Sequence, residues 1–259
     1  VGYDDPVARH WPRFAQGGKE RVTVRQVLTH QGGFPRLPGD FDWHRLGDWE
    51  YATARTAEIT AEWAPGAASG YHTLTYGWAL GDLIRRVDGR MPREFMQEEI
   101  FEPLGVAGEL SLGLAASELD RRSPVHAMSE VTRQDPSGAN GDTSRIVAAY
   151  NDPMVARAQV PAANGYGTAR ALACFYAALT PDGAAGGESL LRPETVAEAT
   201  RLHGETQRDR SLDVPKRYGL GFYLSGLSGD PFDVHDGDGV FGHSGQQSSA
   251  GYADPRYGL

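Results

Sequence analysis

The spacing of apolar residues predicts several helices along the chain. Val22–His30 places its apolar residues on one helical face, and Thr23 and Gln26 have the spacing of a capping box. A longer helix is predicted over Leu74–Val87, where apolar residues recur at three- to five-residue steps and Gly89 follows as a cap. Helices therefore dominate the first part of the chain.

Shorter helices are predicted along the rest of the chain, one of them within a long loop. They span residues Arg93–Phe101, Ser144–Tyr150, Thr168–Leu179 and Pro193–Thr200. Prolines, glycines and the lack of a clean period instead predict an irregular loop with short helical pieces over Phe34–Ala61.

Strand patterns become dominant only near the end of the chain. Tyr218–Leu224, Val240–His243 and Ser249–Ala253 are predicted strands, and the Gly- and Asp-rich segment Gly226–Gly239 separates the first two. A doubly wound parallel sheet would alternate strands with helices, whereas here the helices come first. We therefore expect an α+β fold in which helices flank an antiparallel sheet, together with a region of helices and loops.

Composition and charge exclude several classes of function. Lys and Arg total 25 against 34 Asp and Glu, and the net charge of −9 offers no overall attraction to nucleic acid or to an anionic membrane. The longest apolar stretches fall well below the ~20 residues of a membrane span. The single Cys174 cannot form an internal disulfide, and its apolar helical context predicts a buried, unreactive thiol.

Common catalytic and cofactor motifs are incomplete. Gly242-His243-Ser244-Gly245 begins like the nucleophile elbow of α/β-hydrolases, but Gln246 occupies the last glycine position and no histidine follows Ser244. The eight histidines include no pair at metal-binding helical spacing, so no metal site is predicted. Paired glycines lack the third glycine of a dinucleotide site, and no cofactor is expected.

Five blocks in a fixed order carry a family resemblance. The first, V-T-V-R-Q-V-L-T-H-Q-G-G-F-P at residues 22–35, is similar to V-T-V-R-x-L-L-T-H-x-S-G-L-P. The others are Trp63–Gly66, Tyr71–Gly77, Ile100–Gly105, and Phe241–Gly245 with Ala253-Asp254-Pro255. Over nearly the whole chain they resemble the serine β-lactamase-like superfamily, in the branch of class C β-lactamases, D-alanyl-D-alanine peptidases and related carboxylesterases. The resemblance implies a β-lactamase/transpeptidase-like fold.

The resemblance also implies a serine nucleophile in an S-x-x-K motif at the start of a helix, where the lysine can accept the serine proton. The chain has two lysines, Lys19 and Lys216. The residues three positions before them are Gln16 and Asp213, and neither is a serine. Family order places the motif ahead of the first block, so we expect it upstream of Val1. Residues 1–259 are accordingly predicted to form one partial domain, inactive alone, with its last strand or strands after residue 259.

The resemblance assigns catalytic and binding roles to individual residues. Tyr71 corresponds to the tyrosine of Y-x-N, which relays a proton, and His243 occupies the lysine position of the K-T-G motif; both are candidate catalytic residues. Thr73, Ser244, Gly245 and Gln246 are candidate substrate-binding or oxyanion-hole residues, with the backbone N–H of Gln246 as the oxyanion donor.

Two departures from the family pattern bear on the substrate. An imidazole at His243 is largely neutral at pH 7, where a lysine would carry a cation for a substrate carboxylate. Thr73 replaces an amide that can contact a substrate amide in lactam- and peptide-cleaving relatives. Both changes favour small neutral esters, and therefore a carboxylesterase. A β-lactamase or D-alanyl-D-alanine carboxypeptidase acting on an amide, and a non-catalytic binding or scaffold protein, are the alternatives.

Overall fold

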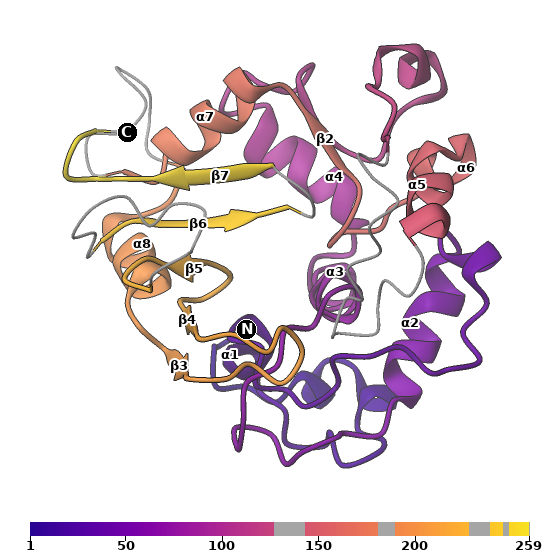
Figure 1. Cartoon of the computed structure of the whole chain (residues 1–259), viewed down its shortest axis with the longest axis vertical. Coiled ribbons are helices and arrows are strands. Elements are labelled where there is room, and N and C mark those ends of the chain that lie inside the picture. The colour runs from indigo at the N-terminus through magenta and orange to yellow at the C-terminus, as the bar shows by residue number, and fades with distance from the viewer. Residues whose placement is uncertain (127–142, 181–189, 228–238, 246–248, 259) are drawn as a thin grey trace.

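The computed structural model describes residues 1–126, 143–180, 190–227, 239–245 and 249–258 (Figure 1). Its main sheet is antiparallel, with strand order β3-β4-β5-β6-β7. The strands are β3 (Gly204–Thr206), β4 (Lys216–Tyr218), β5 (Tyr223–Leu224), β6 (Phe241–Ser244) and β7 (Ala250–Ala253). The expected α+β class with an antiparallel sheet is confirmed.

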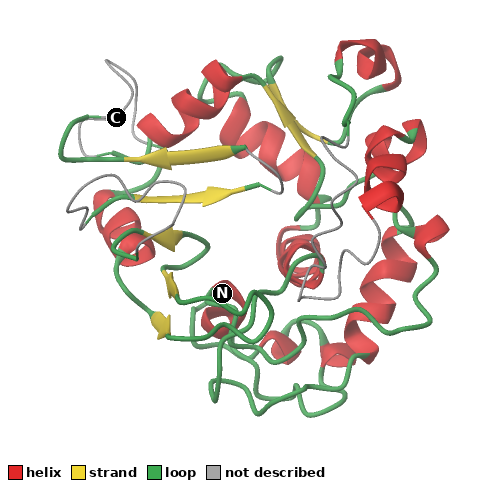
Figure 2. Ribbon diagram, viewed as in Figure 1, coloured by secondary structure: helices red, strands yellow, loops and turns green. Residues whose placement is uncertain are grey.

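Helices surround this sheet and form a second region beside it (Figure 2). They are α1 (Val24–Leu28), α2 (Trp49–Glu58), α3 (Thr75–Asp88), α4 (Pro92–Met96), α5 (Thr143–Asn151), α6 (Pro153–Arg157), α7 (Ala169–Ala177) and α8 (Pro193–Thr200). A five-residue π-helical segment, Gln97–Phe101, continues α4, and short 3-10 helices lie at Val7–Arg9, Pro12–Phe14, Trp43–Arg45 and Ala116–Arg121. Strands β1 (Leu110–Leu112) and β2 (Gly165–Gly167) form a separate antiparallel pair.

The predicted helix boundaries follow their capping residues. Thr23 accepts a hydrogen bond from the Gln26 N–H, and the Gln26 side chain accepts one from the Thr23 N–H, which closes the capping box of α1. Gly89 caps α3 with a φ of 96°, in the left-handed region that glycine adopts without strain. On α7, Cys174 is half-buried rather than buried as predicted, because it packs at the margin of an apolar cluster.

The prediction of one strand over Tyr218–Leu224 is wrong. Gly221, at a φ of 88°, lies in a turn that divides the segment into β4 and β5, and Tyr218 lies directly opposite Tyr223. Alternating apolar residues on two short strands mimic the pattern of one longer strand. The turn matters for the site, because it brings the Tyr218 and Tyr223 rings to a centroid separation of 5.6 Å.

The expected loop over Phe34–Ala61 contains a ten-residue helix, α2. Asp48 caps it by accepting a hydrogen bond from the N–H of Tyr51. Small residues, among them Ala52 and Ala57, form its buried side, so the apolar signal in the sequence was weak.

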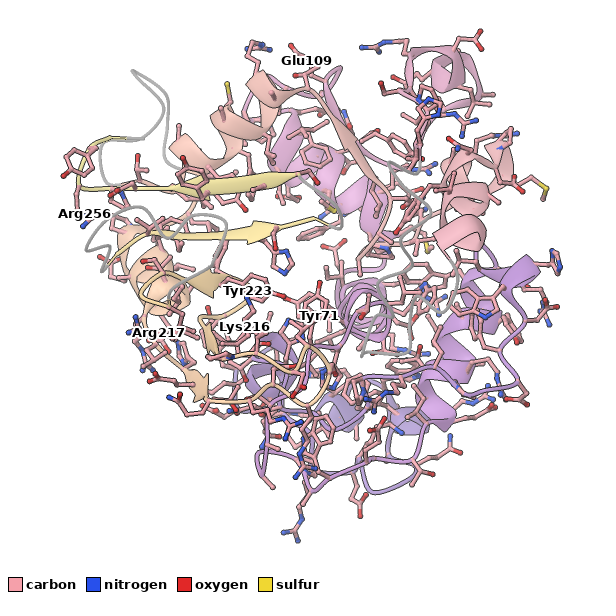
Figure 3. All side chains as sticks on the ribbon, in the orientation of Figure 1. Tyr71, Glu109, Lys216, Arg217, Tyr223 and Arg256 are labelled. Carbon is pink, nitrogen blue, oxygen red and sulfur yellow. The ribbon has the colours of Figure 1, made fainter. Side chains whose placement is uncertain are left out.

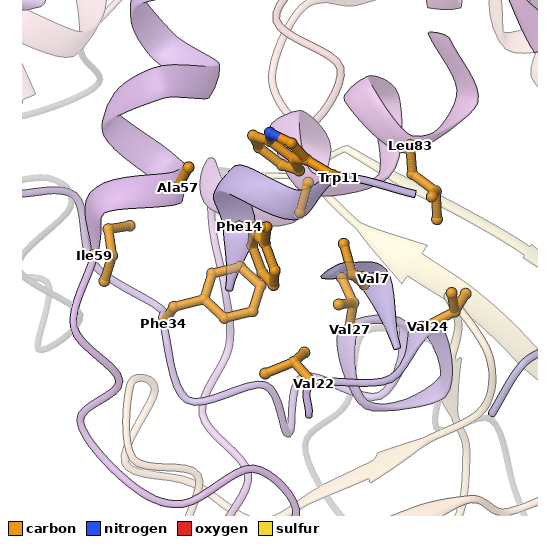
Figure 4. Packing of buried hydrophobic residues seen from close by; sticks show 11 residues of the cluster. Val7, Trp11, Phe14, Val22, Val24, Val27, Phe34, Ala57, Ile59 and Leu83 are labelled. Atoms are coloured by element: carbon orange, nitrogen blue, oxygen red, sulfur yellow. The ribbon is translucent and has the colours of Figure 1, made fainter. Parts of the chain in front are cut away.

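Aromatic packing holds the N-terminal segment against the helices (Figure 4). The Phe14 ring meets Phe34 edge-on at 5.2 Å, and Trp11 packs against Phe14 at 5.1 Å. Val27 from α1 and Leu83 from α3 belong to the same cluster. This core fixes α1, which leads to His30, and α3, which follows Tyr71, and the His30 and Tyr71 rings are in contact.

Candidate active site

The backbone of Tyr71, just before α3, is fixed by a distant carboxylate. Its N–H donates to Oδ1 of Asp209 at 3.0 Å. The same oxygen accepts the N–H groups of Ser211 and Leu212, and Oδ2 accepts the Tyr218 hydroxyl at 2.7 Å. Asp209 is fully buried, so its four accepted hydrogen bonds tie Tyr71 to the turn that precedes β4.

His243 approaches Tyr71 from β6. Their ring centroids are 5.8 Å apart, with the planes inclined at 34°. Tyr223 on β5 contacts both residues, since its ring stacks on His243 at 4.2 Å and lies 6.0 Å from that of Tyr71. The Lys216 Nζ lies 4.4 Å from the centroid of the Tyr223 ring. Figure 3 shows Tyr71, Tyr223 and Lys216 gathered between the sheet and α3.

The hydrogen bond of His243 defines its protonation. Its Nδ1 lies 2.7 Å from the carbonyl oxygen of Ser244, and because a carbonyl only accepts, Nδ1 carries the proton. Burial lowers the pKa of His243, the hydrogen bond to Ser244 acts in the opposite direction, and the Lys216 cation lowers it further. At neutral pH the ring is therefore uncharged, with Nε2 as an acceptor.

Burial also governs Tyr71. It raises the pKa of the Tyr71 phenol to about 12, although a hydrogen bond with the Tyr223 side chain acts to lower it. The phenol is thus protonated at neutral pH. A cation brought close to it would lower this pKa and increase the fraction of phenolate that can accept a proton.

Two buried histidines lie next to Tyr71: one contacts its ring, and the other is hydrogen-bonded to the first. The His30 ring lies 4.7 Å from that of Tyr71, and its Nδ1 accepts the N–H of His72 at 3.1 Å. In turn, Nε2 of His72 accepts the Phe34 N–H at 3.0 Å, and its Nδ1 donates to the Gly70 carbonyl at 2.6 Å. Burial lowers the pKa of His72 to about 4 and that of His30 well below its usual value. Both rings are therefore neutral hydrogen-bonding groups.

The candidate substrate-binding residues lie at the margins of this group. Thr73 is half-buried in the turn that opens α3, and Ser244 is the half-buried last residue of β6. Gly245 donates its N–H to the Ser249 carbonyl at 2.7 Å, in the connection towards β7. Gln246, the predicted oxyanion donor, lies outside the described residues.

Sequence reasoning missed Tyr223, Asp209 and the supporting role of His30. Tyr223 occurs in a segment assigned to one strand, so its position across from Tyr218 was hidden. Asp209 stands in a loop, where the only local signal is its spacing from Ser211, typical of an Asx turn.

The described residues contain neither a metal-binding cluster nor a membrane-spanning helix. No group of three or more His, Cys, Asp or Glu side chains there is arranged to hold a metal ion. Across that same part of the chain, no helix has the length and apolar character needed to cross a bilayer.

Comparison with known proteins assigns the chain to a family. The family model described as beta-lactamase matches residues 1–259. The chain belongs to the beta-lactamase family. Membership confirms both the resemblance carried by the sequence blocks and the predicted fold.

Similar proteins in this family include hydrolases and a penicillin-binding protein homologue. Esterase/beta-lactamase LipL of Mycobacterium tuberculosis is 32% identical over 284 residues, covering 100% of this chain and 62% of its own length. A crystal structure of a family VIII carboxylesterase is 31% identical with a TM-score of 0.87, and a penicillin-binding protein homologue from Caulobacter crescentus is 35% identical with a TM-score of 0.80. Both comparisons include 100% of this chain. They include 69% of the chain in each of the two solved structures.

Proposed function

We propose that this beta-lactamase-family chain is part of a serine carboxylesterase that acts on small neutral esters through an acyl-enzyme. The observation that carries the proposal is the convergence of Tyr71 and His243, whose rings lie 5.8 Å apart although they come from opposite parts of the chain. The similarity to an esterase/beta-lactamase and to a family VIII carboxylesterase supports ester chemistry.

In the proposed cycle, the nucleophile is the serine of an S-x-x-K segment outside residues 1–259. The serine oxygen attacks the ester carbonyl carbon while its proton passes to the phenolate form of Tyr71, which the cation of the motif lysine stabilises. The same proton then leaves with the alcohol as the C–O bond breaks. Water next attacks the acyl-enzyme, releasing the acid and returning a proton to the serine.

The preference for neutral esters follows from the charge at His243. Because burial keeps this imidazole uncharged, it offers hydrogen bonding without a cation for a substrate carboxylate. Thr73 supplies a hydroxyl where lactam- and peptide-cleaving relatives have an amide, which removes a contact to substrate amides.

The test compares two chromogenic substrates with the full-length protein. We expect hydrolysis of p-nitrophenyl butyrate to exceed that of the cephalosporin nitrocefin. Tyr71→Phe removes the proton relay and should lower kcat on the ester by ~100-fold or more. Tyr51→Phe is the matched control, since it removes a hydroxyl that accepts a hydrogen bond from the Asp42 N–H, away from the site.

Other outcomes point to the alternatives. Faster turnover of nitrocefin than of the ester would indicate a β-lactamase. Absence of turnover, together with no covalent serine adduct after treatment with a fluorophosphonate probe, would indicate a binding protein and contradict the enzyme proposal.

A further inference from the structure

Tyr223 contacts both candidate catalytic residues, Tyr71 and His243. Its side chain is hydrogen-bonded to the phenol of Tyr71, and its ring is stacked on His243 with only 21° between the planes. The Lys216 ammonium lies 4.4 Å from the centre of the same ring. Tyr223 itself is only 4% exposed.

The β4–β5 turn explains why Tyr223 occupies this position. Lys216 and Tyr218 are two residues apart on β4 and share a face of the sheet, and Tyr223 lies directly opposite Tyr218. Leu224, the next residue on β5, packs on the opposite face with Phe241. The hairpin therefore presents the phenol of Tyr223 to the site and an apolar side chain to the core behind it.

We infer that Tyr223 is a positioning residue for the proposed acyl transfer, holding the phenol oxygen of Tyr71 and the ring of His243 in one arrangement. The inference rests on the proposed function for its catalytic meaning. Its structural part, the fixation of the Tyr71 phenol by Tyr223, rests on the contacts alone.

The hydroxyl and the ring of Tyr223 have separate effects. As a hydrogen-bond donor, the hydroxyl stabilises the Tyr71 oxygen when that oxygen carries negative charge, which opposes the effect of burial on the phenol. The ring fixes the plane of His243 by stacking and covers it from solvent. A phenylalanine at this position would retain the ring contacts and lose the donor.

Other polar and charged groups around Tyr71 must be considered in any pH measurement. Those that face it from the neighbouring elements are His30, Asp209, Tyr218, His243, Tyr150 from α5 and Tyr76 from α3. Tyr223→Phe leaves all of these side chains in place, so a change in the titration of Tyr71 would report the lost hydroxyl.

The decisive experiment is the pH profile of Tyr223→Phe in the full-length protein with p-nitrophenyl butyrate. We expect kcat to fall ~10-fold with KM nearly unchanged, and the acidic limb of kcat/KM to move ~1 pH unit higher. Tyr223→Leu, which also removes the stack on His243, should cost more. Tyr51→Phe should retain the wild-type profile.

A purely structural role for Tyr223 has a different signature. It would lower the thermal midpoint or the yield of active protein and leave the pH profile of the active fraction superimposable on that of the wild type. That superposition, in a protein where Tyr71→Phe is inactive, would overturn the inference while the esterase proposal stood.

A second measurement tests the inference if the wild-type protein hydrolyses no ester, the outcome that defeats the proposed function. Tyrosine labelled with ¹³C at Cζ gives one NMR signal per phenol, and Tyr71→Phe identifies that of Tyr71. Tyr223→Phe should shift this signal and raise its titration midpoint. An unmoved signal with an unchanged midpoint would overturn the fixation of Tyr71 by Tyr223.

Discussion

At the scale of single residues, His243 determines the charge that a substrate meets. In relatives with a lysine at this position of the motif, the site has a permanent cation. Here the ring is stacked on Tyr223, its Nδ1 proton is donated to the Ser244 carbonyl, and burial keeps it neutral. A change of this residue should therefore alter which substrates are preferred.

His243→Lys should reverse part of the substrate preference. The new ammonium would favour substrates with a carboxylate, so we expect the ratio of nitrocefin to p-nitrophenyl butyrate kcat/KM to rise ~10-fold or more. His243→Gln is the neutral control, for which kcat can fall but the ratio should stay near that of the wild type. An unchanged ratio in His243→Lys would contradict the charge argument.

The sequence could identify a site residue only where that residue belongs to a contiguous motif. Tyr71 and His243 lie within contiguous motifs, so their roles could be inferred before their proximity was known. Asp209 contacts Tyr71 across a separation of 138 residues and belongs to no recognisable motif. Tyr223 depended on a turn at Gly221 that the strand pattern concealed.

At the scale of secondary structure, a buried lysine caps the C-terminal end of helix α2. The Nζ of Lys19 donates to the carbonyl oxygens of Ala57 and Ile59 at the C-terminal end of the helix, and to that of Gln16 at 2.8 Å. The side chain is fully buried, and burial lowers the pKa of Lys19 to about 8. The ammonium thus satisfies three carbonyl groups where water has no access.

Lys19→Met should destabilise the protein by about 3 kcal/mol, because it retains the apolar stem and leaves buried carbonyl groups without a donor. Urea unfolding of the full-length protein measures this. The control is Arg13→Met, which removes an exposed ion pair to Glu58 of the same helix and should cost under ~1 kcal/mol. Equal losses in both variants would contradict the helix-end role of Lys19.

The elements themselves were predicted where the sequence repeats one pattern for several turns. α3 and α7 have regular apolar spacing and clear caps, and both formed within a residue or two of the predicted range. The pair β1 and β2, each of three residues, lacks any comparable signal because its strands are too short for a period to show.

At the scale of the whole molecule, burial of neutral histidines links stability to pH. His72 is fully buried and His30 is 4% exposed, and burial lowers the pKa of both, as it does that of His243. The unfolded chain binds protons near pH 6.5, whereas these folded rings do not. The free energy of unfolding should therefore decline as pH falls below about 6.5.

The range of pH in which this decline occurs distinguishes histidines from carboxylates. Glu198, whose pKa is lowered to about 2 by hydrogen bonding to Arg201, contributes stability that is lost only as pH falls below 4.5, its value when unfolded. The pKa of Lys19 is about 8 in the folded protein and 10.5 in the unfolded chain, so its effect on stability changes between these two pH values. Between about pH 6.5 and pH 4.5, the buried imidazoles are thus the principal source of the change.

Protonation of His72 would also place an N–H against the N–H of Phe34, which now donates to that ring nitrogen. Its shift from 6.5 to about 4 corresponds to about 3 kcal/mol at full effect. Urea unfolding at several pH values should show the decline in the wild type, a smaller slope in His72→Gln, and the wild-type slope in His44→Gln, where the exposed ring of the 3-10 helix Trp43–Arg45 is replaced. A free energy of unfolding that stays constant from pH 7 to pH 5 would contradict this account, because the buried rings would then be protonated as readily as in the unfolded chain.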